Sequence, residues 1–173
     1  MRVYIGGVSG VGKSCIGRRL ASMLRVPHIT GSSVVMQEFG AMDHSELAGL
    51  DLSGQSERIR QAFVRTYQNT PSLVADGHYR LAPEEIPFFR IFFLLTALPE
   101  RLITLRQGDP GRVRACTHQD IQREIEEVEA RAAALESSGD VMAHRLLNQG
   151  TEIQMAEALY LRIQEIRSSS PAS

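Results

Sequence analysis

A glycine-rich octapeptide near the start of the chain, GVSGVGKS at residues 7–14, has the residue types and the spacing that hold phosphate groups. It fits the pattern G-x-x-x-x-G-K-[ST] completely. Glycines at 7, 10 and 12 allow successive backbone N–H groups to turn toward phosphate oxygens, which bulkier residues would obstruct. Ser14 offers a hydroxyl to Mg²⁺, and Lys13 can reach the β- and γ-phosphates. We therefore predict a phosphate-binding loop at residues 7–14.

Lys13 is the only lysine among the 19 basic residues, so the other 18 are arginine. A coding bias toward arginine accounts for that excess but not for the exception. The lysine side chain is a compact charge on a flexible stem, whereas the planar guanidinium of arginine is wider. We interpret position 13 as one where arginine is a poor substitute, and we predict that Lys13 is catalytic.

A carboxylate ends a second apolar segment, because Asp76 closes the run SLVAD at residues 72–76. Strand ends in such sheets face the ligand crevice, and Mg²⁺ takes oxygen ligands beside the phosphates. We predict that Ser14 binds Mg²⁺, and that Asp76 binds it through water and is catalytic. Arg80 is placed to bind a phosphate of the second substrate with two N–H groups, and His78 to position the acceptor.

Three arginines, Arg106, Arg112 and Arg114, surround a stretch rich in glycine and proline. Phosphoryl transfer depends mostly on positioning and on charge neutralisation. We predict that residues 107–116 form a short basic lid that closes over the phosphates and excludes water. The three arginines are predicted to be catalytic.

The elements that must position these residues follow from the hydrophobic pattern. Apolar and β-branched runs predict strands at residues 2–6, 26–30, 72–76, 90–96 and 141–147. Helical spacing predicts helices at residues 14–24, 32–39, 55–68, 117–137 and 151–166, and one that begins at Pro99. Residues 41–54 are polar and irregular and predict a loop, and SSSPAS at 168–173 predicts a disordered tail.

Strands alternate with helices along the chain, which is typical of a parallel sheet with right-handed crossovers. Together with the loop at residues 7–14, this alternation predicts a three-layer α/β/α P-loop NTPase fold with a five-stranded parallel sheet. We predict one domain over residues 1–167, and the family resemblance given below implies that residues 31–60 form an insertion that binds the acceptor.

The composition argues against two classes of partner. The 173 residues carry 19 basic and 20 acidic side chains, so a net charge of −1 disfavours nucleic-acid binding through bulk charge. The longest apolar runs, such as residues 91–95, are far below the roughly 18 residues that cross a membrane. Cys15 and Cys116 make no disulfide framework, and no signal-peptide pattern is present, so we expect a cytoplasmic protein. The sequence leaves a protein partner open.

These motifs resemble those of the P-loop nucleoside monophosphate kinases, most closely the archaeal-type adenylate kinases and their eukaryotic nuclear relatives, which also show ATPase activity. The resemblance covers roughly residues 2–166. It rests on the loop at 7–14, on VADGH at 74–78, on PERL at 99–102 and on the spacing of the three lid arginines. Residues 31–60 match poorly, and Tyr79 stands where ordinary adenylate kinases have proline.

The resemblance implies nucleotide substrates, with ATP and Mg²⁺ as cofactors. The reaction that it implies is transfer of the γ-phosphoryl group of ATP to a nucleoside monophosphate, as in adenylate kinases. It implies acceptor binding by Gly31, Ser32, His78 and Arg80. The residues that it implies for ATP are Gly7, Ser9, Gly10, Val11, Gly12, Lys13, Ser14 and Cys15.

Two other functions fit the same residues. A kinase of a small hydroxylated metabolite would need a base near the acceptor hydroxyl, and Asp76 or His78 is available. An ATPase that acts through a protein partner would use the same loop without an acceptor. A GTPase is disfavoured, because DLSG at residues 51–54 lies in a polar segment and an N-K-x-D motif needs a second lysine. The complete loop disfavours a pure binding module.

Overall fold

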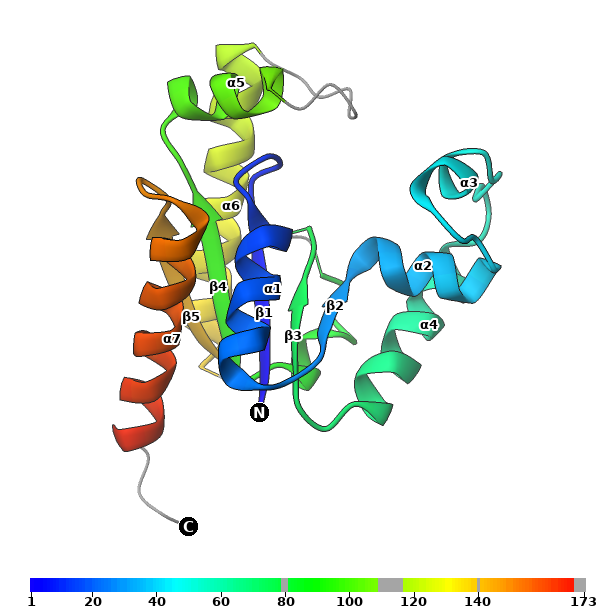
Figure 1. The fold of residues 1–173 in the computed structure, drawn as a ribbon, viewed down its shortest axis with the longest axis horizontal. Helices are drawn as coiled ribbons and strands as arrows, with labels where there is room; N and C mark the ends of the chain where they lie inside the picture. Colours follow the sequence, from blue (N-terminus) through cyan, green and yellow to red (C-terminus); the bar gives the residue numbers. More distant parts are fainter. Residues whose placement is uncertain (79–80, 109–116, 140, 170–173) are drawn as a thin grey trace.

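The computed structural model describes residues 1–78, 81–108, 117–139 and 141–169. Five strands form one sheet in the order β2-β3-β1-β4-β5, and every neighbouring pair is parallel (Figure 1). The predicted five-stranded parallel sheet is therefore confirmed. The strands are β1 (Arg2–Gly7), β2 (His28–Thr30), β3 (Leu73–Asp76), β4 (Ile91–Thr96) and β5 (Met142–Leu147).

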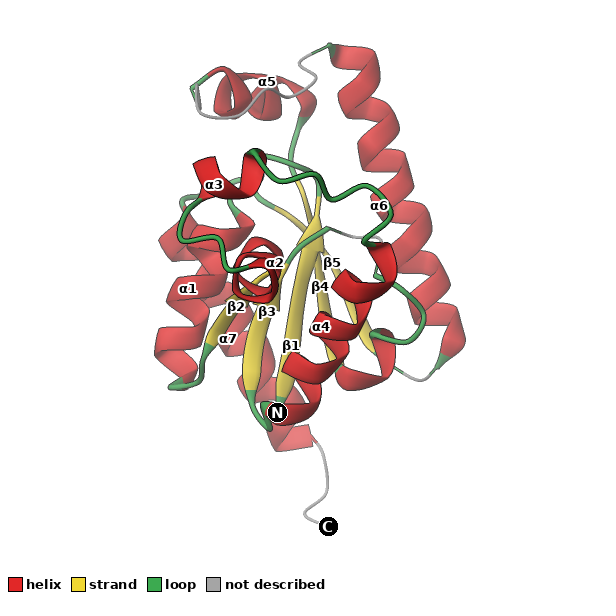
Figure 2. Cartoon of the chain, turned by 90° about the vertical axis from the view of Figure 1, so that its right-hand side faces the viewer, coloured by secondary structure: helices red, strands yellow, loops and turns green. Residues whose placement is uncertain are grey.

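Helices cover both faces of the sheet, which confirms the three-layer α/β/α arrangement. Helices α1 (Lys13–Leu24) and α7 (Glu152–Ser169) lie on one face, and α4 (Ser56–Asn69) and α6 (His118–Ser138) lie on the other (Figure 2). Helix α6 packs on β4 and β5. The stripe that it buries is the predicted one, namely Ile121, Ile125, Val128, Ala132 and Leu135.

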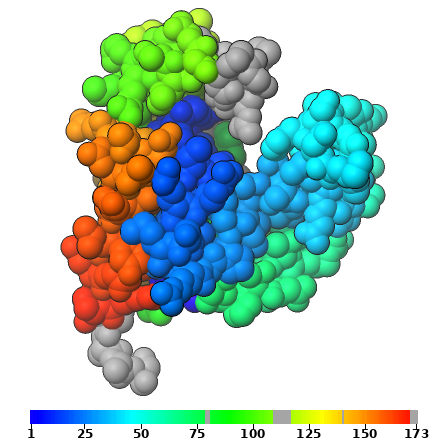
Figure 3. All heavy atoms as spheres, in the orientation of Figure 1, coloured from blue at the N-terminus to red at the C-terminus, as the bar shows by residue number. Residues whose placement is uncertain are grey.

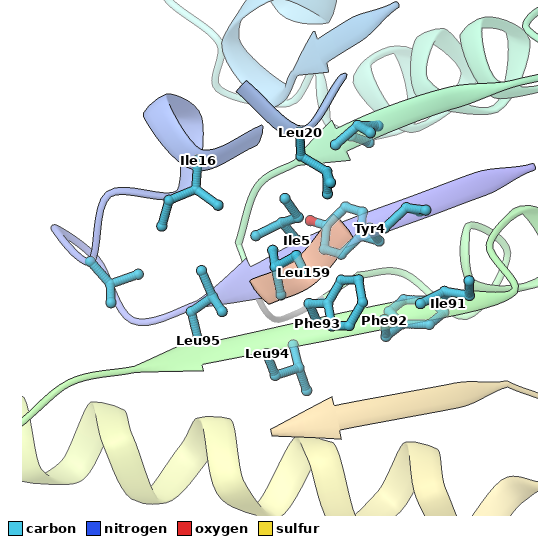
Figure 4. Packing of buried hydrophobic residues seen from close by; sticks show 14 of the residues in the cluster. Tyr4, Ile5, Ile16, Leu20, Ile91, Phe92, Phe93, Leu94, Leu95 and Leu159 are labelled. Carbon is cyan, nitrogen blue, oxygen red and sulfur yellow. The ribbon is translucent and has the colours of Figure 1, made fainter. Parts of the chain in front are cut away.

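The two central strands, β1 and β4, are buried on both faces, which explains why their sequences are apolar without alternation. Every residue from Ile91 to Leu95 is buried. Tyr4 of β1 lies against Phe92 of β4 with ring centroids 5.7 Å apart, and Leu20 of α1 and Leu159 of α7 pack over these strands (Figure 4). This core fixes β1, and so fixes the point at which the phosphate loop leaves the sheet.

Residues 31–69, which connect β2 to β3, form an arm. It consists of α2 (Gly31–Phe39), α3 (His44–Ala48) and α4. Figure 3 shows the arm reaching away from the body of the molecule, with an open notch between its tip and the body. The prediction of a loop at residues 41–54 was wrong where α3 lies. Asp43 begins that helix, because its carboxylate accepts hydrogen bonds from the backbone N–H groups of Ser45 and Glu46.

Other boundaries agree with the sequence to within a few residues. Helix α5 (Pro99–Gln107) begins at the predicted proline, and Thr117 caps α6 by accepting from the N–H of Asp120. Strand β2 begins at His28 rather than at residue 26. Residues 168–169 belong to α7, so the predicted tail was wrong for these two, and residues 170–173 lie outside the described part. A 3₁₀ turn at Ile86–Phe88 was not predicted.

None of the helices in the described ranges combines the length and the apolar character needed to cross a bilayer.

Candidate active site

The phosphate loop joins β1 to α1 at the carboxyl edge of the sheet. Gly7, Gly10 and Gly12 all have positive φ angles, of 135°, 83° and 90°. Residues other than glycine rarely adopt this backbone conformation. A Cβ atom at Gly7 would also lie 2.1 Å from the carbonyl oxygen of Leu95. The glycines predicted to shape the loop therefore stand where the backbone requires them.

Lys13 begins α1, and its side chain turns back over the loop. Its ammonium group donates hydrogen bonds to the carbonyl oxygens of Gly7 at 3.0 Å and Val8 at 2.8 Å. The positive end of the α1 dipole lies at the same place. The loop thus brings together a cation and a helix N-terminus, an arrangement that suits an anion.

Ser14 and Asp76 meet although they are far apart in the sequence. The Ser14 hydroxyl donates to Asp76 Oδ2 at 2.6 Å, and Asp76 is buried at the end of β3. A hydroxyl and a carboxylate are the hard oxygen ligands that Mg²⁺ prefers, and Mg²⁺ in such sites uses few protein ligands. The two residues predicted to hold Mg²⁺ therefore fit that ion. The roles themselves stay predictions.

His28 is a residue of this site that the sequence did not reveal. It lies at the start of β2, and its Nε2 is 2.8 Å from Asp76 Oδ1. Gly17 in α1 leaves room for it, since a Cβ atom there would lie 2.7 Å from His28 Nε2. A glycine inside a helix costs stability, so its presence was the available signal that something approaches α1 closely.

Replacing Gly17 with alanine is expected to lower the free energy of unfolding by about 1–3 kcal/mol, as in other overpacked sites. The new methyl group would push His28 away from Asp76, and this outweighs the gain of about 1 kcal/mol in helix propensity. Urea denaturation measures the change. Gly49→Ala is the control, because the nearest atom to its Cβ lies at 3.5 Å. A Gly17→Ala chain as stable as the wild type would contradict this packing.

A cavity of about 340 Å³ lies between the arm and the carboxyl end of β3, beside Tyr4 of β1. We call it the acceptor pocket. It brings together four of the predicted site residues, namely Gly31, Ser32, Asp76 and His78. Its other lining residues are Tyr4, Val35, Leu47, Leu52, Phe63, Tyr67, Gly77, Leu81 and Glu85. The phosphate loop and the acceptor pocket are therefore joined at Asp76.

The acceptor pocket is apolar and acidic. Burial raises the pKa of Glu85, and burial also raises the pKa of Tyr4 and of Tyr67 well above the ordinary value of a phenol, so both hydroxyls stay neutral. The Tyr4 hydroxyl donates to the carbonyl oxygen of His78 at 2.7 Å. Among the described residues that line the pocket, none is lysine or arginine.

Two further residues that the sequence did not reveal connect neighbouring elements to the phosphate loop. Asn148, buried after the end of β5, donates from Nδ2 to the carbonyl oxygen of Val11 at 3.0 Å. Glu124 of α6 accepts a hydrogen bond from the backbone N–H of Ser9 at 2.5 Å.

Cys15 is an exposed free thiol at the first turn of α1.

Of the three predicted lid arginines, the structure describes Arg106. Arg106 is buried at the end of α5, donates to the carbonyl oxygen of Ser9 and pairs with Glu124. Arg80, Arg112 and Arg114 lie outside the described residues, so their predicted roles remain predictions.

No family model and no curated protein matches the chain. Solved structures match over nearly its whole length. Shikimate kinase from Bacteroides thetaiotaomicron has a TM-score of 0.63 at 16% identity, covering 97% of this chain and 98% of that one. Shikimate kinase from Acinetobacter baumannii in complex with shikimate has a TM-score of 0.63 at 17% identity, covering 99% and 95%. A gluconokinase from Sinorhizobium meliloti 1021 has a TM-score of 0.59 at 15% identity, covering 98% and 97%.

These likenesses show the fold of the chain, which is that of the P-loop kinases with a nucleoside-monophosphate-kinase-like architecture. They do not show the adenylate kinase specificity that the sequence motifs suggested, since the matched proteins are named for shikimate and gluconate rather than for a nucleotide acceptor.

Proposed function

We propose that the chain is an ATP-dependent phosphotransferase that moves the γ-phosphoryl group of ATP to a hydroxyl of a small metabolite. The observation that carries the proposal is the place of Asp76, which contacts Ser14 of the phosphate loop at 2.6 Å and also lines the acceptor pocket. One carboxylate thus lies between the two substrate sites. The fold shared with shikimate kinase and gluconokinase supports the same class of reaction.

The proposed step is an in-line displacement at phosphorus. The acceptor oxygen bonds to the γ-phosphorus as the bond to the β–γ bridging oxygen breaks, and ADP leaves with that electron pair. The acceptor hydroxyl gives its proton to the Asp76 carboxylate. Lys13 neutralises the charge that develops on the phosphates. Ser14, and Asp76 through water, would hold Mg²⁺, which would supply further charge neutralisation.

The charge of the acceptor pocket favours a hydroxylated metabolite over a nucleoside monophosphate. A phosphate group needs cations or clustered N–H groups around it, whereas the described lining offers the carboxyl groups of Asp76 and Glu85 and no lysine or arginine. A monophosphate would depend on Arg80, which the sequence predicts for that purpose. A hydroxyl group needs a base, and Asp76 supplies one.

A separate cavity of about 240 Å³ beside the phosphate loop suits the base of ATP. It is lined by Gly10, Val11, Gly12, Arg101, Leu105, Asn148, Gly150, Thr151 and Glu152. Asn148 is buried, and its Oδ1 has no hydrogen-bond partner among the described residues. A buried acceptor of this kind requires a donor, and the exocyclic amino group of adenine would supply one.

The proposal is tested by an acceptor panel. ADP formation from Mg-ATP is expected to rise at least about tenfold with one hydroxylated sugar, sugar acid or cyclic alcohol, and to stay at the background rate with nucleoside monophosphates. ³¹P NMR of the product would show a phosphate monoester. Efficient transfer to a nucleoside monophosphate would contradict the proposal and favour the adenylate kinase-like alternative. Slow hydrolysis that no acceptor stimulates would favour an ATPase.

A further inference from the structure

Ser9 in the phosphate loop has both of its backbone polar groups bound by side chains from other elements. Its N–H donates to Oε1 of Glu124 at 2.5 Å. Its carbonyl oxygen accepts from Nε of Arg106 at 3.1 Å and from Nη2 of Arg106 at 2.9 Å. Arg106 and Glu124 also pair directly with each other. We call this group of three residues the Ser9 clasp.

The Ser9 clasp joins three elements that are distant in the sequence. Ser9 lies between β1 and α1, Arg106 lies in the last turn of α5, and Glu124 lies near the start of α6. The Arg106 side chain is 2% exposed and the Glu124 side chain is 18% exposed. A charge at such depth is costly unless it is paired and hydrogen-bonded, and the pairing of Arg106 with Glu124 and its hydrogen bonds to Ser9 offset that cost.

The clasp attaches the loop to α5 and α6. The N–H of Val8 still donates to the carbonyl oxygen of Leu95 in β4 at 3.0 Å, and beyond it Gly10 and Gly12 leave the loop backbone conformationally permissive. On the far side, Asn148 holds the carbonyl oxygen of Val11. The clasp holds the near side at Ser9, so Gly10, the residue between these two attachments, is held in one backbone arrangement.

We propose that Glu124 and Arg106 are positioning residues for nucleotide binding, which act through Ser9 rather than by touching the phosphates. This role differs from the one the sequence predicts for Arg106, namely direct contact with the transferring phosphate. The proposal rests on nucleotide binding by the loop, which is one part of the proposed function, and it is independent of the identity of the acceptor.

The test is the affinity for ADP, measured by calorimetric titration without any acceptor. Glu124→Ala is expected to raise the Kd for ADP at least about tenfold, because Ser9 loses its acceptor and Arg106 loses its counter-charge. Glu129→Ala is the matched control. Glu129 is an exposed glutamate of the same helix, so its removal changes the charge equally without touching the loop. Its Kd is expected to stay within about twofold of the wild type.

Amide hydrogen exchange separates positioning from a general loss of structure. In Glu124→Ala, exchange at the Ser9 amide is expected to accelerate at least about tenfold, while the amides of β1 and β4 keep their protection. If Glu124→Ala does not fold, Glu124→Gln serves, since glutamine has one acceptor oxygen and presents an NH₂ donor either to the N–H of Ser9 or to Arg106. The double variant Arg106→Ala, Glu124→Ala is expected to weaken ADP binding by less than the product of the two single effects.

Two results would overturn the inference. An unchanged Kd for ADP in Glu124→Ala, with Ser9 exchange accelerated, would show that the clasp is structural only. A lower Kd would show that the carboxylate opposes the phosphates instead of positioning the loop. If the proposed class of acceptor is wrong, the Kd for ADP and the exchange rates are unaffected, because they are measured without an acceptor. The proposed metabolite kinase and the proposed role of the Ser9 clasp can therefore be rejected separately.

Discussion

Lys13→Arg is expected to lower kcat by about 10²–10³-fold, although it keeps the positive charge, because it removes a group that stabilises the transition state. Lys13 Nζ fits between the carbonyl oxygens of Gly7 and Val8 at 3.0 and 2.8 Å. The planar guanidinium is wider than an ammonium group and forms fork-like, two-pronged contacts. At position 13 it would either displace the backbone of the phosphate loop or lose contact with the phosphates of ATP. Steady-state kinetics with the acceptor found by the panel measure the effect.

A matched exchange elsewhere on the same helix isolates the cause. Arg19→Lys swaps the same two residue types at an exposed position of α1, and its kcat is expected to equal that of the wild type. If Lys13→Arg kept most of the activity, the single lysine of the chain would have no catalytic explanation, and charge alone would suffice at position 13.

Asp76→Asn is expected to lower kcat by about 10²–10⁴-fold, the range for loss of a general base. The side chain keeps its size, but it loses the charge that faces Ser14 at 2.6 Å and His28 at 2.8 Å. The Mg²⁺ concentration at half-maximal rate is expected to rise as well, since the side chain that holds the ion through water loses its charge. A Mg²⁺ titration of the initial rate measures both quantities.

Asp51→Asn is the control for that substitution. Asp51 is an exposed carboxylate that accepts hydrogen bonds from Ser53 within its own turn. Its replacement by asparagine therefore removes the same charge away from the phosphate loop. Wild-type kcat together with an unchanged Mg²⁺ requirement in Asp76→Asn would remove Asp76 from both the metal site and the chemistry.

The sequence predicted most of the fold because its signals are local. Buried parallel strands are apolar without interruption, and the stripe on α6 has helical spacing, so β4 and α6 were found within one residue of their bounds. Helix α3 was missed because it has five residues and no buried side chain. Its only sequence signal was the capping residue Asp43, which polar loops also contain.

The candidate site was predictable where a motif carries it. The loop at residues 7–14 and Asp76 could be named because phosphate chemistry demands those residue types at those places. His28 and Glu124 could not, because their contacts depend on where β2 and α6 pass the loop. In the sequence, Glu124 resembles any polar residue beside an apolar helical stripe, and His28 resembles any residue at the start of a short strand.

The isolated lysine makes the loop accessible to spectroscopy. The amines that the structure describes are the amino group of Met1 and the side chain of Lys13. The Met1 amine donates to the hydroxyl of Ser72 at the opposite edge of the sheet from the phosphate loop, and burial lowers its pKa. Reductive methylation with an isotope-labelled reagent therefore marks two nitrogens that differ in surroundings. One of them reports directly on the loop, with no engineered label and no background from other lysines.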